Sequence, residues 1–287
     1  MLIALASIKG SPGVTTFALA LAAHWPGDTR RVLIECDPAG GDIAPRFGLT
    51  LTPGLISLAA EARRNPGVDG IWRHTQQLPG GLPVVVGPLR PDQARTALQA
   101  LIDNESPGRH GANNLPSAVA GRCDLTVAAD CGRLDPNSPA LPIIRSADHV
   151  LILVQPRRDI LSHLAARLPE IGRLASRVGL VLVGGGYSPA EVTGELDVPV
   201  FASVPDDRRG AALLAGGLSR PGRSRHGLSG AAAKIAMALT NLSPGSGPDA
   251  ALIDTAGPPD CVAGEDEHPT SGTEPTNLLS AANGRLP

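Results

Sequence analysis

Short apolar segments recur along the chain and are separated by stretches with helical character. Seven of them are rich in Val, Ile, Leu and Ala and are bounded by Gly, Pro, Asp or Arg; they span residues 2–8, 31–36, 82–88, 125–130, 149–155, 180–185 and 200–205. Most are apolar at nearly every position, which is typical of strands covered on both faces. The pattern therefore predicts seven buried strands.

Helical candidates lie between these strands, at residues 15–24, 54–64, 92–103, 138–146, 158–176, 207–216 and 229–241. Alternating strands and helices favour right-handed βαβ crossovers. We therefore expect an α/β fold with a doubly wound, mostly parallel sheet and helices on both faces. Ligands bind such sheets at the carboxyl ends of the strands, so the loops after the first, second and fourth strands are the candidate site.

The composition changes near residue 243. The segment 244–287 is rich in Pro, Gly, Ser and Thr, and it carries seven acidic residues against the single Arg285. Such a segment buries too little apolar surface to offset its ordering entropy. We expect one domain over residues 1–242 and a disordered acidic tail over 243–287.

Charge and composition narrow the function classes. The net charge of −2 gives no overall attraction to nucleic acid or anionic membranes. The four cysteines show no CxxC pairing, and no apolar run reaches the length of about 18 residues that suggests a membrane span. The expectation is a soluble cytoplasmic protein. Only two of the 25 basic residues are lysines, Lys9 and Lys234, so a lysine is an informative exception here.

A glycine-containing loop joins the first strand to the first helix. It reads Ile8-Lys9-Gly10-Ser11-Pro12-Gly13-Val14-Thr15-Thr16. Glycines allow backbone N–H groups to curl around a phosphate, and a helix N-terminus adds its positive end. A hydroxyl in the first helical turn, here Thr15, is placed to reach Mg²⁺. Taken alone, the loop fits a phosphate-binding loop or a simple tight turn.

The same loop resembles the deviant Walker A motif KGGxGK[ST][ST] of the ParA/MinD family of P-loop ATPases. The matching residues are Lys9, Gly10, Gly13, Thr15 and Thr16; Ser11 replaces a glycine, and Val14 replaces the second lysine. The resemblance implies that residues 9–11 and 13–16 bind ATP with Mg²⁺. It also implies a nucleotide-dependent homodimer in which Lys9 acts catalytically on the partner's phosphates. The alternative for Lys9 is a solvent-exposed strand end.

Because Val14 stands in place of the motif's second lysine, the phosphates would lack one positively charged contact. A charge-assisted contact of this kind contributes about 1.5–3 kcal/mol, and losing about 3 kcal/mol in the transition state slows a reaction more than a hundredfold. We therefore expect nucleotide binding with weak or no intrinsic hydrolysis.

Two carboxylates follow the second and fourth strands. Asp37 lies in Glu35-Cys36-Asp37-Pro38, which is similar to the family's DxDPxG segment, and the resemblance implies that Asp37 orients the attacking water. Asp130 ends an apolar strand like a Walker B aspartate, which holds Mg²⁺ through water. Gly132-Arg133 stands where the family has Pro-Pro. For Asp42 we expect only a helix-capping role.

Later segments add weaker signals. Pro205 and Asp206 lie in a turn similar to the family's iPxDrr, which implies contact with base and ribose, whereas Gly184-Gly185-Gly186 replaces the asparagine that reads adenine. The last helix is nearly free of charge and is expected to pack on the sheet with Met237 and Leu239 in the core, so stable membrane insertion is not expected.

A basic stretch follows the last predicted strand. It comprises Arg208, Arg209, Arg220, Arg223, Arg225 and His226. Such a cluster can contact nucleic-acid phosphates, but the acidic neighbours and glycines favour a solvated loop.

Three functions remain open at this point. The first is an ATP-binding regulator of positioning or assembly, in partitioning, cell division or pilus and secretion machinery, acting on an unknown protein partner. The second is an active ATPase that partitions DNA or another cargo. The third is an interaction module that binds no nucleotide.

Overall fold

The computed structural model describes residues 1–10, 12–27, 29–65, 67–102, 114–175, 177–216 and 227–242. Ser11, the central part of the basic stretch and the segment expected to form a tail lie outside these residues. The domain boundary at 242 therefore stays a prediction.

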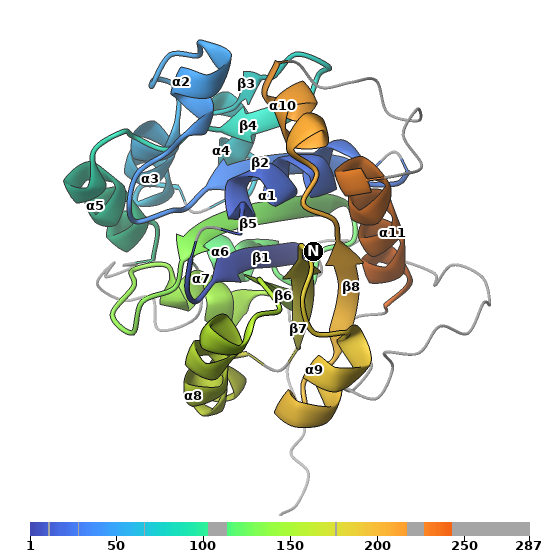
Figure 1. Ribbon diagram of the computed structural model, residues 1–287. Helices are drawn as coiled ribbons and strands as arrows, with labels where there is room; N and C mark the ends of the chain where they lie inside the picture. Colours follow the sequence, from blue (N-terminus) through green and yellow to red (C-terminus); the bar gives the residue numbers. More distant parts are fainter. Residues whose placement is uncertain are drawn as a thin grey trace, which may run out of the picture.

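A single eight-stranded sheet forms the centre of the molecule, in the order β3-β4-β2-β5-β1-β6-β7-β8 (Figure 1). The strands are β1 (Leu2–Ser7), β2 (Arg30–Glu35), β3 (Gln76–Gln77), β4 (Pro83–Val85), β5 (Leu125–Arg133), β6 (His149–Val154), β7 (Val178–Val183) and β8 (Val200–Val204). All pairings are parallel except that of β3 with β4. The predicted fold class and all seven predicted strands are confirmed. The sequence pattern missed β3 because two glutamines carry no apolar signal.

The helices of the described residues are α1 (Val14–Ala23), α2 (Ile43–Phe47), α3 (Leu55–Ala62), α4 (Gly70–Arg73), α5 (Pro91–Ile102), α6 (Leu115–Val119), α7 (Leu141–Ser146), α8 (Arg158–Leu174), α9 (Pro189–Leu196), α10 (Arg208–Gly216) and α11 (Gly227–Asn241). The short helices α2, α4, α6 and α9 were not among the helical candidates. Helix α9 nevertheless has a sequence signal, because Ser188 and Glu191 form a capping box.

The helices form two layers that cover the sheet (Figure 1). Apolar side chains of α1, α2, α10 and α11 pack on one face, and those of α3, α5, α6, α7, α8 and α9 pack on the other. Strands β1 and β6 are buried at every residue. Burial on both faces explains why period-two alternation is missing from their sequences.

Helix α11 packs against β8 of the sheet, as the sequence predicted, and also against α1. Leu239 is fully buried there, but Met237 is 54% exposed, so its expected core position was wrong. The two residues are two positions apart on a helix and therefore point in different directions. No helix in the described part of the chain has the length and apolarity needed to cross a membrane.

Strand order brings the candidate loops together. Strand β5 lies between β1 and β2, and β1 separates β5 from β6. Glu35 of β2 is paired in register with Asp130 of β5, and the Cys36 N–H donates to the Asp130 carbonyl oxygen at 2.7 Å. The loops that follow β1, β2 and β5 consequently share one edge of the sheet.

A prediction for the fold concerns Gly54, which precedes α3. A Cβ placed there would lie 2.7 Å from the Val86 carbonyl oxygen and 2.8 Å from that of Leu51. Gly54→Ala should lower the unfolding free energy by about 1–3 kcal/mol in urea titration, because backbone must move to relieve the overlap. Gly194→Ala in α9 is the matched control: its Cβ meets open space. It should raise stability by about 0.5–1 kcal/mol. Equal effects of the two variants would contradict this account.

Candidate functional site

The loop between β1 and α1 has the backbone shape of an anion cradle. Gly10 and Gly13 adopt positive φ angles of 74° and 85°, a region that side-chain-bearing residues rarely enter. Gly13 is the N-cap of α1 and supplies no side-chain cap, so the first-turn N–H groups face the loop. These groups and the positive helix end suit a phosphate.

Asp130 lies beneath this loop and is almost fully buried. Its Oδ1 accepts the Gly132 N–H at 3.1 Å, and its Oδ2 has no hydrogen-bond partner among the described residues. Burial raises the pKa of Asp130 to about 6, although hydrogen bonding from the Thr15 side chain and from Gly132 acts to lower it. A buried carboxylate with a free oxygen beside a hydroxyl is a donor set that suits a hard divalent cation.

Asp37 packs directly on the backbone near the carboxyl end of β5. Gly132 has a φ of 58°, and a Cβ there would lie 2.1 Å from the Asp37 carboxyl carbon. The Asp37 Oδ1 accepts the Ala39 N–H at 2.8 Å, and partial burial raises the pKa of this carboxyl. The glycine that departs from the family's Pro-Pro pattern therefore makes room for Asp37 beside the Asp130 strand end.

Glu35, rather than Asp42, caps helix α2. The Asp42 side chain makes no cap hydrogen bond, so the expected capping role was wrong. Instead Glu35 Oε1 accepts the N–H groups of Asp42 and Ile43 at 2.7 and 2.8 Å, and Oε2 accepts that of Gly87 at 2.8 Å. Glu35 reaches the same N–H groups from the buried end of β2, which leaves the Asp42 carboxylate free to turn toward Arg46, 3.8 Å away.

A cavity of about 410 Å³ opens over the loop and Asp37, whereas the buried Asp130 is not among its lining residues. Its walls include Gly10, Gly13, Val14, Thr15, Thr16, Asp37, Asp42, Arg46, Arg95, Gly132 and Arg133. Most of the predicted phosphate and metal residues therefore meet at one place. The three arginines were not singled out from the sequence, where lysines drew attention by their scarcity.

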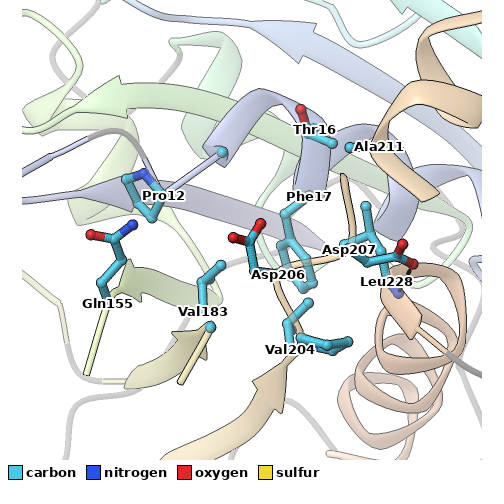
Figure 2. A pocket seen from close by; sticks show the side chains of 13 residues that line it. Pro12, Thr16, Phe17, Gln155, Val183, Val204, Asp206, Asp207, Ala211 and Leu228 are labelled. Carbon is cyan, nitrogen blue, oxygen red and sulfur yellow. Dashed lines mark hydrogen bonds between the residues drawn. The ribbon is translucent and has the colours of Figure 1, made fainter. Parts of the chain in front are cut away.

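A second cavity of about 210 Å³ lies on the other side of the same loop (Figure 2). Pro12, Gly13 and Thr16 line both cavities. Its other walls include Phe17, Gln155, Val183, Gly184, Val204, Pro205, Asp206, Asp207 and Leu228. Pro205 and Asp206, just after β8, thus lie next to the loop, and their predicted contact with base and ribose stays a prediction. Gln155 is a polar lining residue that the sequence analysis missed.

By sequence, the chain matches no protein-family model and no curated protein. By structure it is similar to a ParA family ATPase from Chlorobium tepidum TLS, with a TM-score of 0.62 and 15% identity over 82% of this chain and 98% of the other. It is also similar to the Pyrococcus horikoshii OT3 septum site-determining protein MinD with Mg-ADP, with a TM-score of 0.58 and 17% identity over 83% and 95% of the chains. A Cyanothece McdA–ATP complex gives a TM-score of 0.52 and 14% identity over 76% and 87%.

The chain has the ParA/MinD ATPase fold. Within this fold, the loop position that the motif gives to its second lysine is Val14, whose side chain is 7% exposed and packs with Phe17 in the core below the cavity. Lys9 is exposed, and it is not among the described residues that line either cavity. The chain thus places no lysine of its own at the described cavity walls.

The burial of Asp130 yields a stability prediction for the protein without Mg²⁺. Because its folded pKa lies above the ordinary value for Asp, the folded state loses stability as pH rises from about 4 to about 6. Asp130→Asn removes this charge, so it should stabilise the protein at pH 7 on the order of 2–3 kcal/mol and have little effect at pH 4. Urea titrations at both pH values measure this difference. The control Asp124→Asn, at the exposed opposite end of β5, should give no gain at pH 7. A destabilised Asp130→Asn protein at pH 7 would contradict the argument.

Proposed function

We propose that this protein binds ATP and Mg²⁺ across the two cavities and hydrolyses ATP slowly or not at all, as a nucleotide-dependent regulator of positioning or assembly. The observation that carries the proposal is the buried Asp130 carboxylate, whose Oδ2 lacks a partner among the described residues, beneath a glycine loop that opens a helix. Buried polar atoms nearly always have a hydrogen-bond partner, and a bound cation would explain this exception.

The nucleotide would lie across the loop. The backbone of Gly10 and Gly13 suits the phosphates, and the cavity at Pro205 and Asp206 suits the nucleoside. The shared residues Pro12, Gly13 and Thr16 make a continuous path between the cavities. This chain has Gly184 where the family has the asparagine that reads adenine. The adenine base is therefore proposed from the resemblance in sequence and from the ATP and ADP named for the structurally similar proteins.

Thr15 and Asp130 would hold Mg²⁺, Asp130 through water. When bound, the ion neutralises negative charge on the phosphates. We propose that Asp37 orients a water molecule, because it lines the larger cavity and its carboxylate packs against Gly132. The raised pKa of Asp37 moves it in the direction of a better proton acceptor.

Slow turnover follows from Val14. An apolar side chain packed in the core cannot stabilise the charge that develops on the transferred phosphoryl group. The exposed Lys9 is proposed to supply charge in a second way, by reaching the phosphates of a second copy in a homodimer. That arrangement would couple ATP binding to assembly rather than to fast turnover.

The cellular role is proposed from the names of the structurally similar proteins. The structurally similar proteins include a ParA family ATPase, a cell division ATPase MinD and a protein assigned to plasmid partition, and one MinD is solved in complex with MinC. We propose that this chain likewise acts on a protein partner. Nucleic acid is a less favoured partner, because most of the basic stretch lies among acidic and glycine residues.

The first test is thermal stability of the full chain with and without millimolar Mg-ATP. Wild-type protein should gain several degrees, because a ligand that binds only the folded state stabilises it. Lys9→Ala should keep most of this gain at low protein concentration and lose the additional gain that dimerisation gives at high concentration. Lys234→Ala on α11 is the matched control. Absence of any shift in the wild type would favour the module that binds no nucleotide.

A second test restores the missing cation. Val14→Lys should raise ATP turnover by about tenfold to a hundredfold, since the ammonium can reach the cavity at the end of an apolar stem. The double variant with Asp37→Ala should lose this gain. Fast wild-type turnover, abolished by Asp37→Ala alone, would instead support an active partitioning ATPase.

A further inference from the structure

A positive charge lies near the phosphate loop on a part of the chain that the Walker motif does not include. Three arginines line the phosphate cavity: Arg46 on α2, Arg95 on α5 and Arg133 at the end of β5. The contacts of the three arginines differ, and they indicate which one can take the role of the lysine that Val14 replaces.

Arg46 is the arginine in direct contact with the loop helix. Its Nη1 donates to the Thr16 hydroxyl oxygen at 3.4 Å, and its Nη2 lies 3.8 Å from Asp42 Oδ2. Both distances are long for charged hydrogen bonds, which are usually shorter than 3 Å. The side chain is only 28% exposed, so the guanidinium is held inside the cavity without strong partners in the described part of the protein.

The other two arginines are differently engaged. Arg133 donates through Nε and Nη2 to the two carboxylate oxygens of Asp135, at 3.2 and 3.4 Å, and its side chain is 60% exposed. Arg95 is exposed on α5, and its charge acts to lower the pKa of Asp37. Neither has a hydrogen bond to the residues of α1 in the described structure.

Helix α2 holds Arg46 in place. The buried Glu35 accepts the first two N–H groups of this helix, and Ile43 and Ala44 are buried under it. Gly41, just before the helix, lies so close to Gly87 that a Cβ would approach its carbonyl oxygen to 2.7 Å. The backbone beneath Arg46 is therefore fixed, and little ordering is needed when the side chain meets an anion.

We infer that Arg46 binds the phosphate chain of the nucleotide and supplies the charge that Val14 does not. The inference rests on the proposed function, because it concerns the same nucleotide. Thr16, which Arg46 contacts, lines both cavities and appears at the edge of the second one in Figure 2. Arg46 therefore meets the phosphates where they pass from one cavity to the other.

The chemistry of the side chain fits this place. A guanidinium binds phosphate oxygens through two parallel N–H groups, which a lysine cannot do. When the nucleotide binds, Arg46 would exchange its long contacts with Thr16 and Asp42 for shorter, charge-assisted hydrogen bonds to phosphate oxygens. Since the contact is to the inner part of the phosphate chain, it should strengthen binding of the diphosphate and the triphosphate alike, and not that of the nucleoside.

The test is equilibrium binding of Mg-ADP, Mg-ATP and adenosine to the full chain by calorimetry. Arg46→Met keeps the length and apolar stem of the side chain and removes the charge. It should weaken both nucleotides by about tenfold to a hundredfold and leave adenosine unchanged. Arg46→Lys should lose about three- to tenfold, because it keeps the charge and loses the paired donors. Adding Val14→Lys to Arg46→Met should recover at least half of the lost binding free energy.

The control is Arg122→Met, at the amino end of β5, where the arginine is partly exposed and paired with Asp124. It should bind both nucleotides as the wild type does. Wild-type affinity in Arg46→Met would overturn the inference and leave the proposed function intact. If Arg46→Met fails to fold, wild-type affinity in Arg46→Lys together with unchanged affinity on adding Val14→Lys would overturn it. Absence of nucleotide binding in the wild type would overturn both proposals.

Discussion

A buried carboxylate ties together the backbone around the site. Glu35 ends β2 at 2% exposure, and it accepts N–H groups from the start of α2 and from Gly87 after β4. These hydrogen bonds set the direction in which the chain leaves β2, and so the positions of Asp37 and Arg46. Removing such a group would leave several buried donors without partners, each at a cost of about 1–3 kcal/mol.

The same arrangement concentrates negative charge in a place with little water. Burial raises the pKa of Glu35 to about 7 and that of Asp130 to about 6, and each carboxylate is close enough to others to raise its pKa further. Glu35 is compensated by three N–H donors, whereas Asp130 receives fewer. Both carboxylates are therefore shifted toward the protonated form in the absence of a cation, and Asp130, next to Thr15, is the one that a bound cation would relieve.

The departures from the deviant Walker motif are consistent with one another. Val14 packs in the core at the position where the motif has a lysine. Gly132 stands where the motif has a proline, and the Asp37 carboxylate fills the space that a side chain would take. Arginines from α2, α5 and β5 surround the cavity from outside the loop. The site therefore keeps carboxylates, hydroxyl and backbone donors in the usual places and takes its positive charge from other elements. We therefore propose that this arrangement holds a nucleotide rather than accelerating its hydrolysis.

The sequence by itself determined the fold class, the seven main strands and the three loops of the site. Strands buried on both faces need long apolar runs, which are visible in the sequence. The glycine loop and the two strand ends with Asp37 and Asp130 are each short local motifs, so each can be recognised by itself. Only the tertiary structure decided that Glu35 rather than Asp42 caps α2, that Met237 is exposed, and that Gly132 accommodates Asp37. It alone brought Arg46 to Thr16, thirty residues away. These outcomes depend on which side chains from distant segments reach the same few ångströms, and no local pattern encodes that distance.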